Sequence, residues 1–338
     1  MTQPEPTPNT LNGYASDFPF AESDRERLSA ALSPAPAFFA NRRQELIELA
    51  RGRPEINVLT PFGFPIDELL HLLPNLRWLA LSSAGAEHAL SQPWASGPNA
   101  PLITTASGVH SAPISEHIFS AMLLWSRHWP DMLRLQSVRS WPDFSGRNAL
   151  AGRELDGATL LVIGLGAIGR RVAQLGRAFG MRVIGVRHST TPDATDPDTN
   201  QLGGMVDLDT LLPAADYVVI ATPSTPETRG MFSAARLALM KPTAMLVNIA
   251  RGEIVDEPAL IAALTSGKLG AAALDVTARE PLPSDDPLWT TPNVFISPHI
   301  SGLTPRYSAR LTDILLDNFT RYRAGAPLRN LVQPERGY

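Results

Sequence analysis

TLLVIGLGAIG, residues 159–169, joins a short apolar run to three glycines, Gly164, Gly166 and Gly169, in the spacing GxGxxG. The apolar run is typical of a buried strand, and a helical pattern at about 167–179 follows at once. The glycines allow a tight turn, close approach of a pyrophosphate to the backbone, and close helix–strand packing. The helix N-terminus would present N–H groups to the phosphates. GxGxxG alone also fits an ordinary tight turn, but between a strand and a helix it predicts a dinucleotide-binding loop.

Similar apolar runs lie on both sides of this stretch and alternate with helical patterns, which is typical of an α/β fold. Downstream, strands are predicted at 182–186, 217–221, 244–250, 270–276 and 293–297. Upstream, they are predicted at 56–59, 78–81 and 102–104. The runs are almost continuously apolar, as expected for parallel strands covered on both faces. The sequence therefore predicts two Rossmann-like or flavodoxin-like domains, each with a doubly wound parallel sheet.

Other segments are predicted as helices or loops. A stretch rich in Thr, Asp and Pro at 189–203 indicates a loop, and the last helix covers about 304–323. A long helical pattern runs from Pro113 to about Val138, and Pro130 should interrupt it. Three tryptophans are assigned to packing, with a dimer face or a cap over a cleft as the alternatives: Trp125, Trp129 and Trp141.

The composition excludes several classes of protein. The 338 residues include no cysteine and carry a formal net charge of −4, which rules out disulfides and Cys-ligated metals and disfavours a nucleic-acid partner. No apolar run reaches the roughly 20 residues of a membrane span, and residues 1–20 have no signal-peptide pattern. The histidines form no HxxxH or HExxH pattern, so no metal is assigned. We therefore expect a cytoplasmic protein without nucleic-acid or membrane partners.

Arginine is in large excess, with 27 arginines against two lysines. Arg187 follows the strand at 182–186, 18 residues after Gly169, where an NAD site usually carries Asp or Glu. Arg187, His188 and Ser189 offer cationic groups and a hydroxyl donor, which suits the 2′-phosphate of NADP. They predict a preference for NADP(H) over NAD(H). The alternative is an exposed arginine at a strand end.

Arg251, Glu280 and His299 each lie beyond a predicted strand. Ligands of doubly wound sheets bind outside the carboxyl ends of the strands, so all three are expected at the edge marked by GxGxxG. Singly, they also fit a solvated arginine, a loop charge and a turn histidine. Together they fit hydride transfer to a 2-keto acid. Histidine would protonate the carbonyl oxygen, the carboxylate would orient the histidine, and the guanidinium would clamp the substrate carboxylate.

Over about residues 55–332 the sequence resembles the D-isomer-specific 2-hydroxyacid dehydrogenase family, in particular its NADP-dependent glyoxylate/hydroxypyruvate reductase-like branch. The stretches that carry the resemblance are GLGAIG at 164–169, VNIARGEIVDEPAL at 247–260, AALDVTAREPLPSDDPLW at 272–289, SPHISG at 297–302 and GAPLRNLV at 325–332. Their order and spacing make the resemblance specific. It implies an enzyme that transfers hydride between NADP(H) and a small 2-keto or 2-hydroxy acid.

The resemblance also implies roles for individual residues. Arg251 would bind the substrate carboxylate, Glu280 would pair with the histidine, and His299 would be the acid and base. The implied cofactor residues are Gly164, Gly166, Ala167, Ile168, Gly169, Arg187, His188, Ser189, Thr222, Pro223, Thr228, Ile249, Ala250, Asp275 and Gly302, with Asp275 on the nicotinamide amide. The implied substrate residues are Ser83, Ala84 and Gly85, whose backbone amides would meet the carboxylate, together with Arg251 and His299.

Family members are built from two domains, which here implies a discontinuous substrate domain at 1–112 and 305–338 and a dinucleotide-binding domain at 113–304. They usually form homodimers through the cofactor domain, including the helix that begins near Pro113. Residues 1–40 offer no match to the family's first strand. Two alternatives stay open. One is a dinucleotide-sensing, corepressor-like binding protein on the same scaffold. The other is a phosphoglycerate dehydrogenase-like enzyme that lacks the regulatory domain.

Overall fold

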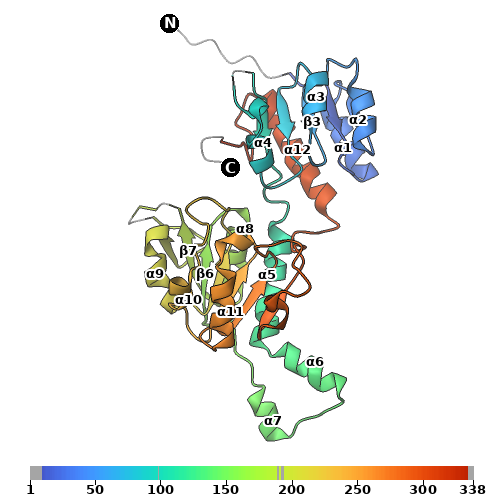
Figure 1. Cartoon of the computed structure of the whole chain (residues 1–338). Coiled ribbons are helices and arrows are strands. Elements are labelled where there is room, and N and C mark those ends of the chain that lie inside the picture. Colours follow the sequence, from blue (N-terminus) through green and yellow to red (C-terminus); the bar gives the residue numbers. More distant parts are fainter. Residues whose placement is uncertain (1–9, 98, 189, 192–193, 334–338) are drawn as a thin grey trace. The chain divides into compact units, whose positions relative to one another are not determined.

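The computed structural model describes residues 10–97, 99–188, 190–191 and 194–333, apart from the side chain of Glu87. The chain forms two compact units, and Figure 1 labels many of their elements. Unit 1 comprises the described parts of Met1–His110 and Thr304–Tyr338, and unit 2 comprises those of Ser111–Leu303. Each unit contains its own parallel sheet between helices, which confirms the predicted α/β class.

Unit 2 is built on a seven-stranded parallel sheet in the order β12-β11-β10-β9-β6-β7-β8. Its strands are β6 (Thr159–Ile163), β7 (Arg182–Arg187), β8 (Gln201–Gly204), β9 (Tyr217–Ile220), β10 (Met245–Asn248), β11 (Ala271–Leu274) and β12 (Val294–Ile296). All but β8 match predicted strands. The prediction of a loop throughout 189–203 is wrong at its end, because β8 pairs with β7 as an edge strand. Its Gln-Leu-Gly-Gly sequence has little strand propensity of its own.

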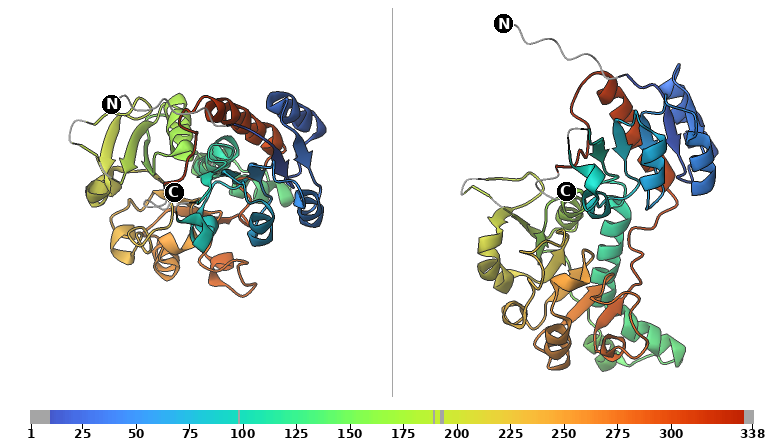
Figure 2. Two further views of the ribbon diagram at one scale, coloured as in Figure 1. Left: turned by 90° about the horizontal axis from the view of Figure 1, so that it is seen from above. Right: turned by 45° about the horizontal axis from the view of Figure 1, so that its top comes forward.

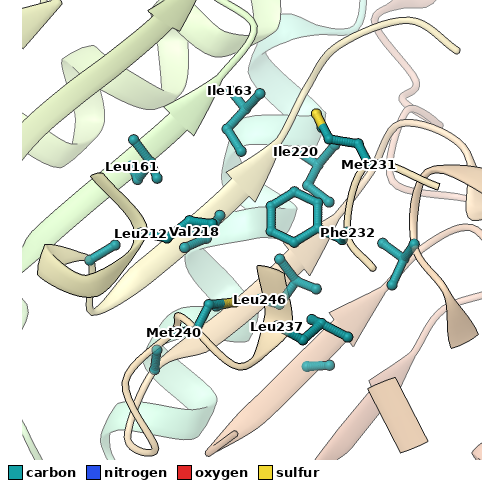
Figure 3. Close-up of a cluster of buried hydrophobic side chains, with 14 of the residues drawn as sticks. Leu161, Ile163, Leu212, Val218, Ile220, Met231, Phe232, Leu237, Met240 and Leu246 are labelled. Carbon is teal, nitrogen blue, oxygen red and sulfur yellow. The ribbon is translucent and has the colours of Figure 1, made fainter. Parts of the chain in front are cut away.

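Helices cover both faces of this sheet (Figure 2). One face carries α9 (Leu208–Leu211), α10 (Ala234–Leu237) and α11 (Glu257–Thr265), and the other carries α5 (Ser111–Ser126) and α8 (Ala167–Ala178). Successive side chains of β6 alternate between the two layers, so Leu161 and Ile163 join the first cluster and Leu160 and Val162 join the second. Figure 3 shows the first cluster around Phe232. Burial on both faces explains why the strands read as continuous apolar runs.

The long helical pattern after Pro113 is divided into α5, α6 (Trp129–Ser137) and α7 (Phe144–Ala149). His128 adopts a left-handed backbone with a φ of 53°, and Pro130 lies in the first turn of α6, so the predicted interruption is confirmed. α6 and α7 extend away from the sheet of unit 2 (Figure 1). Trp141 is 87% exposed and Trp129 is 47% exposed, so the prediction of packing is wrong for these two, whereas Trp125 packs against the second cluster.

Unit 1 is built on a five-stranded parallel sheet in the order β2-β1-β3-β4-β5. Its strands are β1 (Tyr14–Ser16), β2 (Ala37–Phe39), β3 (Val58–Thr60), β4 (Trp78–Ala80) and β5 (Leu102–Thr104). The last three match predicted strands. β1 and β2 lie within residues 1–40, where the sequence predicts no strand.

Two helical layers also cover the sheet of unit 1. One consists of α2 (Arg43–Ala50), α3 (Asp67–Leu72) and α4 (Glu87–Leu90), and the other of α1 (Glu22–Leu32) and α12 (Tyr307–Arg323). On α12, Phe319 and Tyr322 pack their rings against Trp78 of β4. The last described helix therefore completes a core otherwise formed by the first third of the chain. None of the helices in the described ranges is long and apolar enough to cross a membrane.

Candidate active site

The predicted phosphate loop lies at the switch point of the unit 2 sheet, between β6 and β9. Counted from β6, the strands follow the order 3-2-1-4-5-6 and then a seventh, the order of dinucleotide-binding sheets. Gly164 leaves β6 with a φ of 97°, a conformation that favours glycine. Gly166 is the N-cap of α8, whose first turn carries Ala167 and Ile168. The backbone N–H groups of this turn are the ones that an anion would meet.

The glycines of this loop differ in what surrounds them. A Cβ on Gly169 would lie 1.9 Å from the carbonyl oxygen of Gly164, so α8 packs directly on the turn. A Cβ on Gly166 would meet no atom within 4 Å, so this glycine borders open space. Open space in front of a helix N-terminus is what a pyrophosphate needs, so these residues fit a dinucleotide.

Three of the predicted site residues follow strands of the same sheet. Arg251 comes after β10, Asp275 directly follows β11, and His299 comes after β12. All strands of the sheet are parallel, so these residues lie at its carboxyl edge, as does Gly164. The tertiary structure thus brings the predicted polar residues to the edge that carries the phosphate loop.

His299 and Glu280 form a hydrogen-bonded pair at this edge. Nδ1 of His299 lies 2.8 Å from Oε2 of Glu280. The other carboxylate oxygen, Oε1, accepts a hydrogen bond of 3.2 Å from the backbone N–H of Thr277, which holds the carboxylate in place. The side chains are 53% and 39% exposed. When Nδ1 donates to Glu280, Nε2 is the nitrogen that can exchange a proton with a ligand.

The buried carboxylate of Asp275 anchors the segment that carries His299. Its oxygens accept hydrogen bonds from the hydroxyl groups of Ser297 and Ser301 and from the backbone N–H groups of Ile300 and Ser301. The backbone carbonyl of Asp275 also accepts from the N–H of His299, at 2.9 Å. Burial by itself would raise the pKa of Asp275, but these hydrogen bonds outweigh it and hold the pKa below its usual value. The proposed contact of Asp275 with a nicotinamide amide stays a prediction.

Arg251 is presented by a turn that Asn248 closes. The buried side chain of Asn248 accepts from the N–H of Ala250 at 3.0 Å and donates to the carbonyl of Arg251 at 2.9 Å. The next residue, Gly252, packs so closely that a Cβ would lie 1.9 Å from the backbone of Thr277. Since Thr277 also donates to Glu280, the turns that carry Arg251 and Glu280 are packed against each other. The Arg251 residue itself is exposed.

The remaining predicted cofactor residues of unit 2 lie in several loops. Thr222 and Pro223 follow β9, and the hydroxyl group of Thr228 braces their loop by accepting from the N–H of Thr225 and donating to the carbonyl of Pro223. Ile249 and Ala250 are buried directly after β10, and Gly302 lies beyond His299. Arg187 ends β7 and is followed by the exposed His188. Ser189 lies outside the described residues.

The predicted substrate loop belongs to unit 1. Ser83, Ala84 and Gly85 follow β4, and the hydroxyl group of Ser83 donates to the carbonyl of Gly85 at 2.7 Å. The preceding residue, Ser82, donates its hydroxyl to Pro61 in the loop after β3, at 2.9 Å, and its carbonyl accepts from the hydroxyl of Tyr307 on α12. The loop is therefore tied to its own sheet edge on two sides.

Several residues that hold this site together were not identified from the sequence. They are Asn248, Ser297 and Ser301, described above, and Arg170 and Asp196, which contact each other near Arg187. Asn, Ser, Asp and Arg are common in loops and on surfaces, so no signal in the sequence separates these from their many equivalents. Across the described part of the chain, no group of three or more His, Asp or Glu residues could hold a metal ion.

The fold and the site define a dinucleotide-binding protein with a histidine–carboxylate pair at the sheet edge that carries its glycine loop. Residues 119–301 match the family described as "D-isomer specific 2-hydroxyacid dehydrogenase, NAD binding domain". The chain belongs to this family, as the sequence predicts.

Individual relatives agree with this assignment. The chain is 33% identical to glyoxylate/hydroxypyruvate reductase B of Citrobacter koseri, over 79% of this chain and 81% of that protein. It is 35% identical to D-3-phosphoglycerate dehydrogenase of a Synechocystis strain, over 64% of this chain but 38% of that protein. The chain therefore spans well under half of the phosphoglycerate dehydrogenase that it matches.

Solved structures share the whole fold. A D-isomer-specific 2-hydroxyacid dehydrogenase of Xanthobacter autotrophicus Py2, in complex with NADPH and MES, superposes with a TM-score of 0.79. The match covers 97% of this chain and 100% of that one, at 28% identity. Both α/β units of the chain therefore have the same folds as the units of known 2-hydroxyacid dehydrogenase structures.

Proposed function

We propose that the protein is a D-2-hydroxyacid dehydrogenase that works as a 2-keto acid reductase with NADP(H). The observation that carries the proposal is the 2.8 Å pair of His299 and Glu280 at the sheet edge that also bears the GxGxxG loop. A proton donor beside a dinucleotide site is what reduction of a carbonyl group requires. The substrate is glyoxylate, hydroxypyruvate or a related small 2-keto acid, and the relative from Citrobacter koseri is named for the first two.

The chemistry divides among the residues of the site. Bound NADPH supplies the hydride for the carbonyl carbon. Nε2 of His299 donates the proton that the carbonyl oxygen needs, while Glu280 orients the ring through Nδ1. In the reverse direction the same nitrogen accepts the proton from the hydroxyl group.

The substrate is held by its carboxylate. The guanidinium group of Arg251 forms two parallel hydrogen bonds with it, which orients the carbonyl group. That backbone amides of Ser83, Ala84 and Gly85 in unit 1 also bind a substrate carboxylate stays a prediction. In this proposal residues 1–112 and 305–338 form the substrate domain, and residues 113–304 form the dinucleotide-binding domain.

A substrate panel tests the proposal. Purified protein is mixed with NADPH or NADH and glyoxylate, hydroxypyruvate, pyruvate, phenylpyruvate or 3-phosphohydroxypyruvate, and the loss of absorbance at the nicotinamide band is followed. Turnover of a small 2-keto acid supports the proposal. Preference for the phosphorylated acid would instead favour the phosphoglycerate dehydrogenase-like function, which the similarity to the Synechocystis enzyme raises. Dinucleotide binding without turnover of any acid would favour a sensor.

The preference for NADP(H) rests on Arg187 at the end of β7. Arg187→Asp should lower kcat/KM for NADPH relative to NADH on the order of 10- to 100-fold, since a contact between charged groups of roughly 1.5–3 kcal/mol is lost. In Arg187→Asp the introduced carboxylate would also face Asp196. Arg187→Gln is therefore the companion variant, because it removes the cation without adding a negative charge. Initial rates with both cofactors give the ratio, and an unchanged ratio in both variants would refute the preference.

The proposed assembly is a homodimer formed through the helices that follow Pro113. Large apolar side chains on and around α6 and α7 are exposed, namely Trp129, Met132, Leu133, Val138, Trp141 and Phe144. Exposed apolar patches of this kind mark sites of association. Light scattering should give twice the chain mass of 36.5 kDa, and Trp141→Asp should shift the protein towards the monomer. A monomeric wild-type protein at micromolar concentration contradicts this assembly.

A further inference from the structure

The carboxylate of Asp196 lies between two arginine side chains at the end of β7. Nη1 of Arg170 is 2.8 Å from its Oδ2, and the same oxygen accepts from Nη2 of Arg187. The side chain of Asp196 is 1% exposed, while those of Arg170 and Arg187 are 40% and 34% exposed. A buried carboxylate thus joins two guanidinium groups that still reach solvent.

We propose that Arg170 and Arg187 together bind the 2′-phosphate of NADP(H), and that Asp196 is the positioning residue that holds both guanidinium groups. The inference rests on the proposed preference for NADP(H) and extends it to two residues. Asp196 acts through the arginines and does not itself touch the phosphate.

The positions of Arg170 and Arg187 in the fold support a shared phosphate site, here called the arginine cradle. Arg170 directly follows Gly169 in the first half of α8, and Arg187 ends β7, which pairs with β6. The two side chains therefore come from the elements that flank the phosphate loop. A guanidinium group carries five N–H donors, more than its contact with Asp196 uses, so each can also donate to a phosphate.

The position of Asp196 is itself defined by its turn. Its Oδ1 accepts from the N–H of Asp198 at 3.1 Å, and its backbone carbonyl accepts from the N–H of Thr199 at 3.1 Å. Two neighbouring guanidinium groups repel each other and would separate into solvent without a counter-charge between them. A buried carboxylate is in turn costly unless it is paired, so the three groups hold one another in one arrangement.

Replacement of Asp196 distinguishes positioning from simple charge. Asp196→Asn keeps the size and the Oδ1 acceptor but removes a negative charge beside the proposed phosphate. If only the net charge mattered, this variant would bind a 2′-phosphate more tightly. If Asp196 positions the arginines, binding weakens, by about tenfold or more for the loss of one well-oriented charge-assisted contact.

Asp198 provides the matched control. Its carboxylate lies 3.6 Å from the same Arg170 nitrogen and is 19% exposed. Asp198→Asn removes the same charge from the same turn without removing the carboxylate that joins the two arginines. We expect it to bind a 2′-phosphate as tightly as the wild type or more tightly.

The experiment is calorimetric titration with adenosine 2′,5′-bisphosphate and with 5′-AMP, which differ by the 2′-phosphate. Asp196→Asn and Arg170→Gln should each weaken binding of the bisphosphate about tenfold or more and leave 5′-AMP within about twofold. Arg170→Gln replaces a partly exposed helix residue, so it tests the cradle even where Asp196→Asn does not fold. In turnover, both variants should raise KM for NADPH more than they change kcat.

The outcomes separate this inference from the function on which it rests. Unchanged or tighter binding of the bisphosphate by Asp196→Asn would overturn the positioning role of Asp196. Unchanged binding of the bisphosphate by Arg170→Gln would show that Arg170 does not contact the 2′-phosphate. If the wild type binds the bisphosphate no better than 5′-AMP, the preference for NADP(H) itself fails, whatever the variants do.

Discussion

His299→Asn is expected to lower kcat for reduction of the 2-keto acid by about 100- to 10,000-fold, the range that one positioned acid–base group contributes. Asparagine keeps a polar group near the position of Nδ1 but does not titrate, so it cannot deliver the proton that Nε2 supplies. The affinity for NADPH should stay within about twofold, because the phosphate loop is formed by other residues. Stopped-flow absorbance under single-turnover conditions measures the chemical step, and fluorescence titration measures the affinity.

Glu280→Gln is the companion to this variant. The amide oxygen of glutamine can still accept from the N–H of Thr277, but the side chain no longer offers a carboxylate to Nδ1 of His299. We expect a smaller loss of kcat than in His299→Asn, since the imidazole itself remains.

A His299→Asn protein that keeps more than a tenth of the wild-type kcat would show that the proton comes from another group.

Gly169→Ala is expected to destabilise unit 2 and to abolish NADPH binding. The added methyl group would lie 1.9 Å from the carbonyl oxygen of Gly164, which is backbone and cannot rotate away. Either α8 or the turn after β6 must shift, and overpacking of this kind costs about 1–3 kcal/mol or more. A melting temperature lower by several degrees and the absence of saturable NADPH binding are the expected results.

Gly166→Ala is the matched control within the same loop. A Cβ at this position meets no atom within 4 Å, and Gly166 has a φ of −75° that any residue adopts. The melting temperature should therefore stay close to that of the wild type. NADPH binding should still weaken, because the methyl group occupies the space that the pyrophosphate would approach. Equal melting temperatures for Gly169→Ala and Gly166→Ala would contradict the packing argument.

Much of the fold could be predicted because its strands carry a strong local signal. In β6, β9 and β10 nearly every residue is apolar, since these strands are covered on both faces. β1, β2 and β8 could not be predicted from their composition. Tyr-Ala-Ser in β1 and Gln-Leu-Gly-Gly in β8 include few residues that favour strands, and Ala-Phe-Phe in β2 directly follows Pro34 and Pro36. Their strand conformation comes from pairing with a neighbour distant in the chain, as when β1 pairs with β3.

By itself the sequence determined which residue types follow which strands. The local sequence shows glycines after β6, an arginine after β10 and a histidine after β12. Parallel strands bring their carboxyl ends to one edge of the sheet. From these facts follow the α/β class, the family and the candidate site.

Only the tertiary structure decided how the polar groups are paired and which apolar groups stay uncovered. Asp196 holds two arginines from different elements, Asp275 anchors the segment around His299, and Trp141 lies in solvent. Each of these depends on contacts between residues distant in the chain, or on their absence. A hydrogen bond or ion pair requires donor and acceptor within about 3 Å, and residue type alone does not specify that distance.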